Sequence, residues 1–365
     1  MRKTCLDTVY ELAKKDKKIV FIGSDLGPGV LDNFKKEMPE RFFMEGVSEQ
    51  AIIGLSAGLA MEGFKPYVNT IATFISRRCY EQVVIDLCLH DLPVRLIGNG
   101  GGLVYAPLGP THLALEDIAL THELDYVSRV SKNLLTEKEK REIGLPEIEK
   151  FSQRAFFASA GTLLTGKVAL EKGIALNTAG GSHHASSRKG SGFCIFNDVA
   201  VAINCLLFKK ILSRVLVLDL DVHQGDGTAE IFDSNNNVCT ISVHCEKNFP
   251  ARKVPSNIDI PLPVKTSDYD YLEALETVLS VIKSFKPDLV FYIAGVDVHE
   301  DDNLGLLKVT SEGIRFREKR IISFFKGSGI PIAVTLGGGY QNDTKKLARL
   351  HSIIFEEAFS KFLHI

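Results

Sequence analysis

The chain has 365 residues, of which 45% are hydrophobic and 24% charged, and its formal net charge at pH 7 is −2. These values are typical of a globular protein long enough for two domains, and such a nearly neutral chain is not expected to bind nucleic acid. The sequence has no apolar run of membrane-spanning length, and its N-terminus is too polar for a secretory signal. Its seven cysteines include no CxxC pair, which favours neither a disulfide framework nor a zinc knuckle. We therefore expect a reduced, cytoplasmic protein.

Apolar runs that are typical of buried strands alternate with helical patterns along the chain. In chain order, the expected strands cover residues 18–23, 93–98, 214–220, 238–244, 288–295 and 331–338. Helices are expected around 49–62, 74–89, 151–171, 196–209, 268–285, 311–327 and 343–362. This alternation predicts parallel α/β sheets covered by helices, and ligands in such sheets gather at the carboxyl ends of the strands.

The charged stretch 121–150 interrupts this alternation. We place a domain boundary there, and expect an α/β chain with two parallel-sheet units, residues 1–121 and 122–365.

One strand of the second half ends in acidic residues. In "LDLDVHQGDG" (218–227), Asp219, Asp221 and His223 alternate, so that an extended backbone directs them to one face. Buried carboxylates are costly unless something pairs with them. Taken alone, however, the Asp-x-His pattern favours a plain strand end followed by an acidic loop.

Three further segments change that interpretation. "GGSHHASSRKGSGFCIFND" (180–198) contains the pair His183 and His184, "YIAGVDVHEDDNLG" (292–305) has Asp297 after a strand, and "VTLGGGYQND" (334–343) has Tyr340 behind three glycines. Each segment alone is a weak indication, because a histidine pair is often structural and Gly-Gly-Gly-Tyr can be a turn. Together they predict His, Asp and Tyr side chains in loops on one side of a parallel sheet.

These four segments, in this order, resemble the histone deacetylase superfamily, and most of all its class IV branch and related bacterial deacetylase-like proteins. The resemblance covers about residues 122–365. It implies an arginase–deacetylase α/β fold and a zinc-dependent amidohydrolase that removes acetyl or related acyl groups from amines.

The resemblance also implies a metal site. Asp221, His223 and Asp297 match the ligands of a Zn²⁺ or Fe²⁺ ion, and such a donor set leaves positions open for water and substrate. Backbone carbonyls near Asp219, Asp221, His223 and Ser242 are further implied to bind a structural K⁺ ion.

The implied catalytic residues surround that site. His184, oriented by Asp226, matches the general base, and His183, paired with Asp219, matches the second histidine. In the implied mechanism, a metal-bound water loses its proton to His184 and attacks the acyl carbon, while the metal and the Tyr340 hydroxyl stabilise the oxyanion.

A substrate channel is implied as well. Phe193 matches a residue that grips the alkyl stem of an acyl-lysine or polyamine, and Gly192 leaves room for the backbone to approach it. Phe249 is a candidate for the opposite wall, although a core phenylalanine is an equally good interpretation.

Residues 1–121 resemble a different family, the pyrimidine-binding domain of transketolase-like thiamine diphosphate enzymes. The matching segments are "RFFMEGVSEQAIIGLSAGLAMEGFKPYV", "ATFISRRCYEQVVIDLCLHDLPVRLIG" and "GGGLVYAPLGPTHLALEDIAL". The resemblance implies that Glu49 contacts the aminopyrimidine, that Phe74 stacks on its ring, with Arg77 in place of a second aromatic residue, and that His112 faces the substrate. Nothing resembles the Gly-Asp-Gly and Asn motif that binds metal and diphosphate, so thiamine diphosphate is not expected to bind without a partner chain.

Both resemblances are partial. The last third of the pyrimidine-binding domain gives way to deacetylase-like sequence near Thr121, and the deacetylase part lacks the usual N-terminal elements. Three functions therefore stay open: a metal-dependent deacylase, which we favour, a component of a thiamine enzyme, and a catalytically defective fusion. The expected partners are an acylated amine (a protein lysine, a polyamine or a small acylamide) and, through the N-terminal half, a thiamine-enzyme subunit or a second copy of the chain. Neither nucleic acid nor a membrane is expected as a partner.

Overall fold

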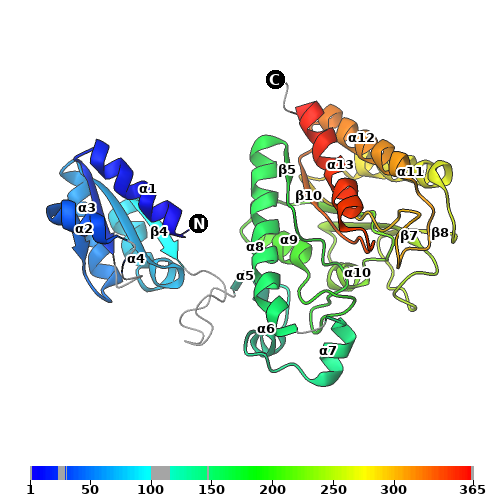
Figure 1. Cartoon of the computed structure of the whole chain (residues 1–365), viewed down its shortest axis with the longest axis horizontal. Coiled ribbons are helices and arrows are strands. Elements are labelled where there is room, and N and C mark those ends of the chain that lie inside the picture. The colour runs from blue at the N-terminus through cyan, green and yellow to red at the C-terminus, as the bar shows by residue number, and fades with distance from the viewer. Residues whose placement is uncertain (1, 24–28, 30, 100–115, 146–147, 363–365) are drawn as a thin grey trace. The chain divides into compact units, whose positions relative to one another are not determined.

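The computed structural model describes residues 2–23, 29, 31–99, 116–145 and 148–362 and divides into two compact units, residues 1–114 and 115–365 (Figure 1). Each unit has its own sheet, and the described strands of both sheets pair in parallel. The α/β fold class with two parallel-sheet units is therefore confirmed.

The division between the units falls a few residues before the one expected from the sequence. The Thr121 hydroxyl donates to the carbonyl of Ala200, and the Asn204 amide donates to the Thr121 hydroxyl. Ala200 and Asn204 belong to a helix of the second unit, so the segment that leads to Thr121 is bonded to that unit.

The N-terminal unit has a four-stranded sheet in the order β2-β1-β3-β4. Its described elements are α1 (Arg2–Lys15), β1 (Ile19–Gly23), α2 (Asp32–Glu37), β2 (Phe42–Met44), α3 (Glu49–Met61), β3 (Lys65–Ile71), α4 (Tyr80–Gln82) and β4 (Arg95–Asn99). Successive residues of a strand face opposite sides, and both sides of β1 are buried. Phe21 packs with Phe34 on one side and Ile22 packs with Ile52 of α3 on the other.

The expected single helix over 74–89 is interrupted. Phe74–Arg78 and Val83–Cys88 form wide π-helical turns on either side of α4. Cys79, at the first break, has a φ of −124°, outside the helical range, and its thiol bonds to the carbonyls of Phe74 and Ile75. The sequence indicated the helical character of this segment but not its interruption.

The C-terminal unit has a six-stranded sheet in the order β5-β10-β9-β6-β7-β8. Its described elements are α5 (Glu116–Ala119), α6 (Leu124–Ser131), α7 (Glu137–Ile143), α8 (Ile148–Lys172), β5 (Ile174–Leu176), α9 (Asp198–Phe208), β6 (Val215–Asp219), α10 (Asp226–Phe232), β7 (Val238–Cys245), β8 (Ile258–Leu262), α11 (Asp268–Phe285), β9 (Leu289–Ile293), α12 (Ser311–Ser328), β10 (Ile332–Thr335) and α13 (Thr344–Phe362).

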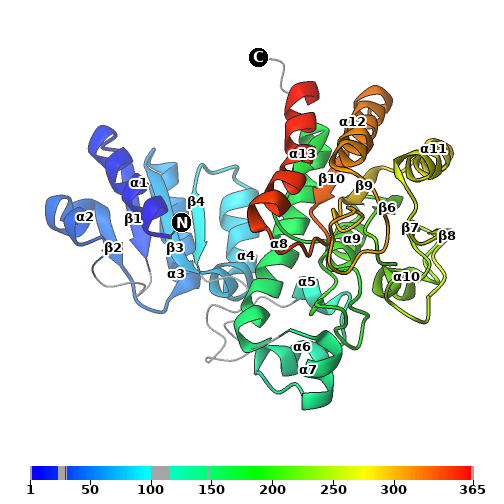
Figure 2. The same ribbon diagram turned by 45° about the vertical axis from the view of Figure 1, so that its right-hand side comes forward.

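Helices cover both faces of this sheet, which explains why its central strands are continuously apolar. Val217 of β6 and Phe291 of β9 face the cluster formed with α8 and α9. Leu218 and Tyr292, the next residues along each strand, face the cluster formed with α11, α12 and α13, which lie side by side (Figure 2).

The strand order determines which loops meet. Because β10, β9 and β6 are neighbours and parallel, the segments that follow their carboxyl ends lie at one edge of the sheet. These segments contain Asp221 and His223, Asp297, and the glycines that precede Tyr340.

Candidate active site

Three potential metal ligands converge where β6 and β9 end. The ligand atoms of Asp221, His223 and Asp297 all lie within 4.8 Å of one another, and the three side chains are buried. Nδ1 of His223 lies 3.0 Å from Oδ1 of Asp221 and 3.1 Å from Oδ2 of Asp297. The three residues predicted as metal ligands are thus adjacent in space.

Backbone groups and close approaches hold the two carboxylates. The Gly338 amide donates to Oδ2 of Asp221 at 2.6 Å, and the Val222 amide donates to Oδ1 of Asp297 at 2.9 Å. A Cβ at Gly338 would lie 2.1 Å from Asp297 and 2.7 Å from Asp221, so only glycine fits at this position.

The donor set fits a divalent cation. Burial and the nearby charge of Asp221 raise the pKa of Asp297 to about 7, because two adjacent buried carboxylates cannot both ionise cheaply. Burial alone would lower the pKa of His223, but the two carboxylates raise it to about 10. A bound cation would remove the repulsion between the carboxylates, and two oxygen ligands with one imidazole suit zinc or iron(II).

The histidine pair lies beside these ligands, and a carboxylate holds each ring. Nδ1 of His183 lies 2.6 Å from Oδ2 of Asp219, and Nδ1 of His184 lies 2.6 Å from Oδ1 of Asp226. Such bonds fix the tautomer and leave Nε2 as the remaining nitrogen of each ring. Nε2 of His183 lies 3.8 Å from Oδ1 of Asp221.

The two histidines differ in electrostatic environment. Burial, followed by the charge of His183, lowers the pKa of His184 to about 4, so its imidazole is neutral at pH 7. Burial alone would also lower the pKa of His183, but Asp219 and Asp221 raise it to about 9. A cation held by Asp221 would oppose the shift at His183, because it would offset the negative charge that causes it.

Tyr340 faces the same site from the loop after β10. Its ring centroid lies 6.0 Å from that of His223, and its amide donates to Oδ2 of Asp302 at 2.7 Å. Burial and the carboxylates of Asp221 and Asp297 raise its pKa far above the ordinary value. The phenol therefore stays protonated and can donate a hydrogen bond.

A cavity of about 470 Å³ opens toward this site, and the three predicted channel residues line it. Phe193 and Phe249 are 45% and 44% exposed, and Phe249 contacts the edge of the His184 ring with centroids 4.9 Å apart. Gly192 has a φ of +52°, and a Cβ there would lie 2.5 Å from Cδ2 of His184. Of the two interpretations of Phe249, the exposed position favours the channel wall over the core.

Comparisons with known proteins agree with this geometry. The family model described as histone deacetylase domain matches residues 95–357. The chain belongs to the histone deacetylase family. A second model, described as transketolase, pyrimidine binding domain, matches residues 1–127, and the two matches overlap over 95–127.

Similar proteins of known sequence come from several organisms. An uncharacterized protein of Picosynechococcus is 45% identical over 70% of this chain and 84% of its own length. Histone deacetylase 2 of Arabidopsis thaliana is 33% identical over 51% of this chain and 49% of its own. The acetoin utilization protein AcuC of Staphylococcus aureus is 32% identical over 76% of this chain and 77% of its own.

A solved structure shares the deacetylase fold. The crystal structure of the HDA15 HD domain superposes with a TM-score of 0.54 at 24% identity, covering 69% of this chain and 76% of that one. In the part of the chain that the structure describes, no helix is both long enough and apolar enough to span a bilayer.

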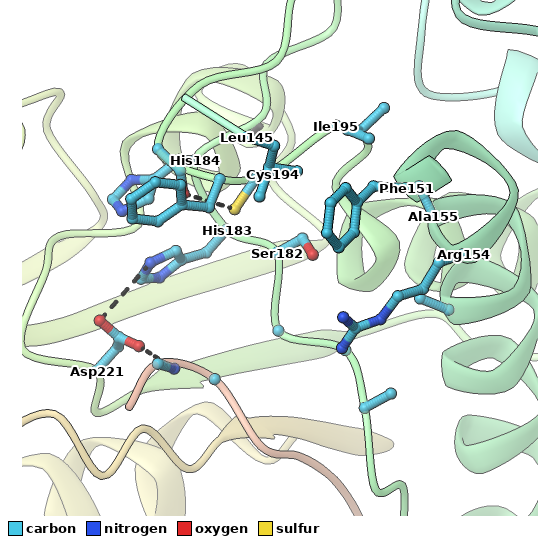
Figure 3. A pocket seen from close by; sticks show the side chains of 18 of the residues that line it. Leu145, Phe151, Arg154, Ala155, Ser182, His183, His184, Cys194, Ile195 and Asp221 are labelled. Carbon is cyan, nitrogen blue, oxygen red and sulfur yellow. Dashed lines mark hydrogen bonds and ion pairs between the residues drawn. The ribbon is translucent and has the colours of Figure 1, made fainter. Parts of the chain in front are cut away.

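A second cavity of the deacetylase unit, of about 380 Å³, extends behind the histidines. His183, His184 and Asp221 line one side of it, and Phe151 and Arg154 of α8 line the other (Figure 3). Sequence reasoning missed Arg154. The signal that could have found it is a charged residue on a helical face that Phe151, Ala155 and Ala158 otherwise make apolar.

Sequence reasoning also missed the support of the histidine loop. The buried carboxylate of Asp198 accepts hydrogen bonds from the amides of Gly181 and Ser182 and from the Thr162 hydroxyl. These bonds fix the turn that leads into His183. Asp198 directly follows the helix-capping Asn197, and that capping position was the available signal.

Of the residues predicted to bind K⁺, Asp219 and Ser242 are paired on the neighbouring strands β6 and β7, and Asp221 and His223 follow the end of β6. The K⁺ site itself stays a prediction.

Among the described residues of the N-terminal unit, Arg78 contacts two of those predicted to bind thiamine diphosphate. Glu49 is 4% exposed, and its Oε2 lies 3.7 Å from Arg78, while the Arg78 guanidinium lies 3.4 Å from the Phe74 ring centroid. Arg78 thus lies against both residues predicted to contact the aminopyrimidine, whereas Oε1 of Glu49 is buried without a hydrogen-bond partner among the described residues, and the thiamine site stays a prediction. His112 lies outside the described residues.

Proposed function

We propose that the C-terminal unit, with residues 122–365 as the functional part, is a divalent-metal-dependent amidohydrolase that removes an acetyl or related acyl group from an amine. The observation that carries this proposal is the convergence of the Asp221–His223–Asp297 triad with the His183–His184 pair and Tyr340. Family membership supports the same reaction class.

Asp221, His223 and Asp297 would hold the cation, with zinc or iron(II) as the candidates. When bound, the cation supplies Lewis acidity at the acyl carbonyl and lowers the pKa of water. The buried position of all three residues keeps bulk water away from these charges and so strengthens their interaction.

His184 is the proposed general base. Asp226 holds its Nδ1–H, so Nε2 carries the lone pair that accepts the proton of the attacking water. His183 is the second histidine, with Asp219 orienting it in the same way. One of the two imidazoles then returns a proton to the departing amine.

Tyr340 is the proposed oxyanion donor. Its protonated hydroxyl would donate to the acyl oxygen as negative charge develops there, an interaction worth roughly 3–4 kcal/mol in a well-aligned site. The hydrogen bond from the Tyr340 amide to the Asp302 carboxylate fixes the loop that carries the Tyr340 side chain.

The substrate class is an acylated amine with a narrow stem. Phe193 and Phe249 are partly exposed aromatic residues that line the cavity beside His184, and such apolar walls suit the alkyl stem of a substrate. An acetyl-lysine, an acetylated polyamine and a small acylamide all satisfy this requirement.

A component of a thiamine diphosphate enzyme that needs a partner chain stays the alternative function of the N-terminal unit, which matches the pyrimidine-binding model. A cytoplasmic location and association through this unit, with a second copy or with a thiamine-enzyme subunit, stay predictions.

The test is turnover of a fluorogenic acetyl-lysine peptide and of an acetylated polyamine by the full chain. We expect a chelator to abolish turnover and Zn²⁺ or Fe²⁺ to restore it. Glu49→Gln is the matched control, because Glu49 belongs to the other unit and effects of separate sites are independent. Folded, metal-replete protein that hydrolyses none of a panel of acylated amines would contradict the proposal.

A further inference from the structure

A charged side chain is buried close to the metal site without facing it. Arg317 of α12 is 0% exposed, and it is the largest fully buried side chain among the described residues. A buried charge is costly unless excellent geometry compensates for it. A hydrophobic residue would fill this position without that cost, so the contacts of the guanidinium need an explanation.

The guanidinium joins the two segments that lead to the carboxylate ligands. Its Nη1 donates to the Gly295 carbonyl at 2.8 Å and lies 3.4 Å from the Leu220 carbonyl. Leu220 directly precedes Asp221, and Gly295 lies two residues before Asp297. One nitrogen therefore contacts the backbone of both strand ends.

Other side chains fix the arginine in this position. Nε donates to the Glu318 carboxylate at 2.9 Å, and the Tyr292 hydroxyl donates to the other oxygen of Glu318 at 2.8 Å. The Tyr271 hydroxyl lies 3.2 Å from Nη1 and 3.4 Å from the Leu220 carbonyl. The guanidinium is thus held by Tyr271 of α11 and Glu318 of α12, and Tyr292 of β9 in turn holds Glu318.

The spacing of these two segments determines where the carboxylates lie. A Cβ at Gly295 would lie 2.7 Å from both Cα and Oδ2 of Asp221, so the segments are in direct contact. Two carbonyl oxygens that point to the same place repel each other unless a donor lies between them. Arg317 supplies that donor.

We propose that Arg317 is a positioning residue of the metal site, whose guanidinium ties the carbonyls of Leu220 and Gly295 and thereby fixes the separation of the Asp221 and Asp297 carboxylates. This inference rests on the proposed function, because it takes those two residues as metal ligands.

Arg317→Lys tests the role, because lysine keeps the charge but loses the planar fork that reaches several partners. Arg320→Lys is the matched control: Arg320 is on the same helix, but it is 44% exposed and pairs with Glu276. The measurements are the Zn²⁺ dissociation constant by competition with a chromophoric chelator, the visible spectrum of the Co²⁺-loaded protein, and the unfolding temperature of the metal-free protein.

We expect Arg317→Lys to weaken Zn²⁺ binding by about 10–100-fold and to change the Co²⁺ band intensities, while the metal-free protein stays folded. Arg320→Lys is expected to match the wild type in both measurements. If Arg317→Lys has the Zn²⁺ affinity and the Co²⁺ spectrum of the wild type, the positioning role of Arg317 is overturned, but the proposed function is not.

The failure of the proposed function gives a different result. If the wild type does not bind stoichiometric Zn²⁺, or if Asp221→Ala binds it normally, the ligand assignment fails and this inference fails with it. If Arg317→Lys does not fold, Arg317→Gln replaces it, since glutamine removes the guanidinium that contacts the Leu220 and Gly295 carbonyls and keeps a hydrogen-bond donor. A changed Co²⁺ spectrum in that variant supports the role, and an unchanged one overturns it.

Discussion

Replacing Gly192 with alanine tests whether the His184 ring must stay where the structure has it. A Cβ on Gly192 would lie 2.5 Å from Cδ2 of His184 and 3.1 Å from Cε1 of Phe249. The first distance is far below van der Waals contact, so the imidazole has to move. Because Nδ1 of His184 is held 2.6 Å from Asp226, that movement disturbs the bond that orients the ring.

Two effects of Gly192→Ala can be estimated separately. The left-handed backbone costs alanine about 1–2 kcal/mol, which lowers the Tm of a unit of this size by roughly 2–8 °C. Displacing the ring by on the order of 1 Å costs about 100-fold in rate, or about 2.7 kcal/mol of activation free energy. We therefore expect kcat to fall by about 100-fold while the metal content stays unchanged.

Gly329→Ala separates the two effects. Gly329 ends α12 with a φ of +70°, and a Cβ there would meet nothing within 4 Å. This variant is expected to lose Tm in the same way but to keep its kcat in the fluorogenic acetyl-lysine assay. Equal kcat losses in the two variants, or full activity in a well-folded Gly192→Ala, would refute the reasoning.

Three further predictions concern the ligands, the oxyanion donor and acid stability. Asp221→Ala and Asp297→Ala should each lose most of the bound metal after dialysis, because each residue supplies one of three protein ligands. A normal metal-to-protein ratio in both variants by elemental analysis would contradict the assignment of these residues as metal ligands. Tyr340→Phe should keep the metal but lose about 10²–10³-fold in kcat, and an unchanged kcat would exclude the donor role. Burial lowers the pKa of His122 and of His244 to about 4, below the unfolded value of about 6.5, so the unfolded chain binds more protons and Tm should fall as pH drops from 6.5 to 4. Titration of either imidazole near pH 6.5 in the folded protein, followed by NMR, would contradict this prediction.

The sequence by itself determined much of the secondary structure and of the candidate site, although elements such as β8 and α10 were not among those expected. The run expected as a strand over 214–220 forms β6 over Val215–Asp219, because helices bury both of its faces and its first four residues are apolar. Asp221, His223 and Asp297 follow directly after such strands, and a parallel sheet brings those ends together. A short-range pattern thus predicted a long-range cluster, because sheet topology relates the two.

Some local features were less determined. The helical pattern over 74–89 did not reveal the break at Cys79, since the side-chain bonds of its thiol do not appear in hydrophobic periodicity. The environment of Phe249 stayed open for a similar reason: an aromatic residue fits a core or a channel equally well until its exposure is known. Glu49 of the N-terminal unit is predicted to meet a cofactor, and nothing in the sequence indicated that Arg78 lies beside it.

Only the tertiary structure decided what the arginines do. Arg317 contacts the Leu220 carbonyl across a sequence separation of 97 residues, and Arg154 lines the cavity opposite His183. The spacing of Arg317 does not distinguish it from an arginine on a solvent-exposed helical face, and the apolar neighbours of Arg154 indicate an unusual position but not the cavity that it lines. The free energy that keeps a guanidinium buried comes from partners on other elements, so its role exists only once those elements have packed together.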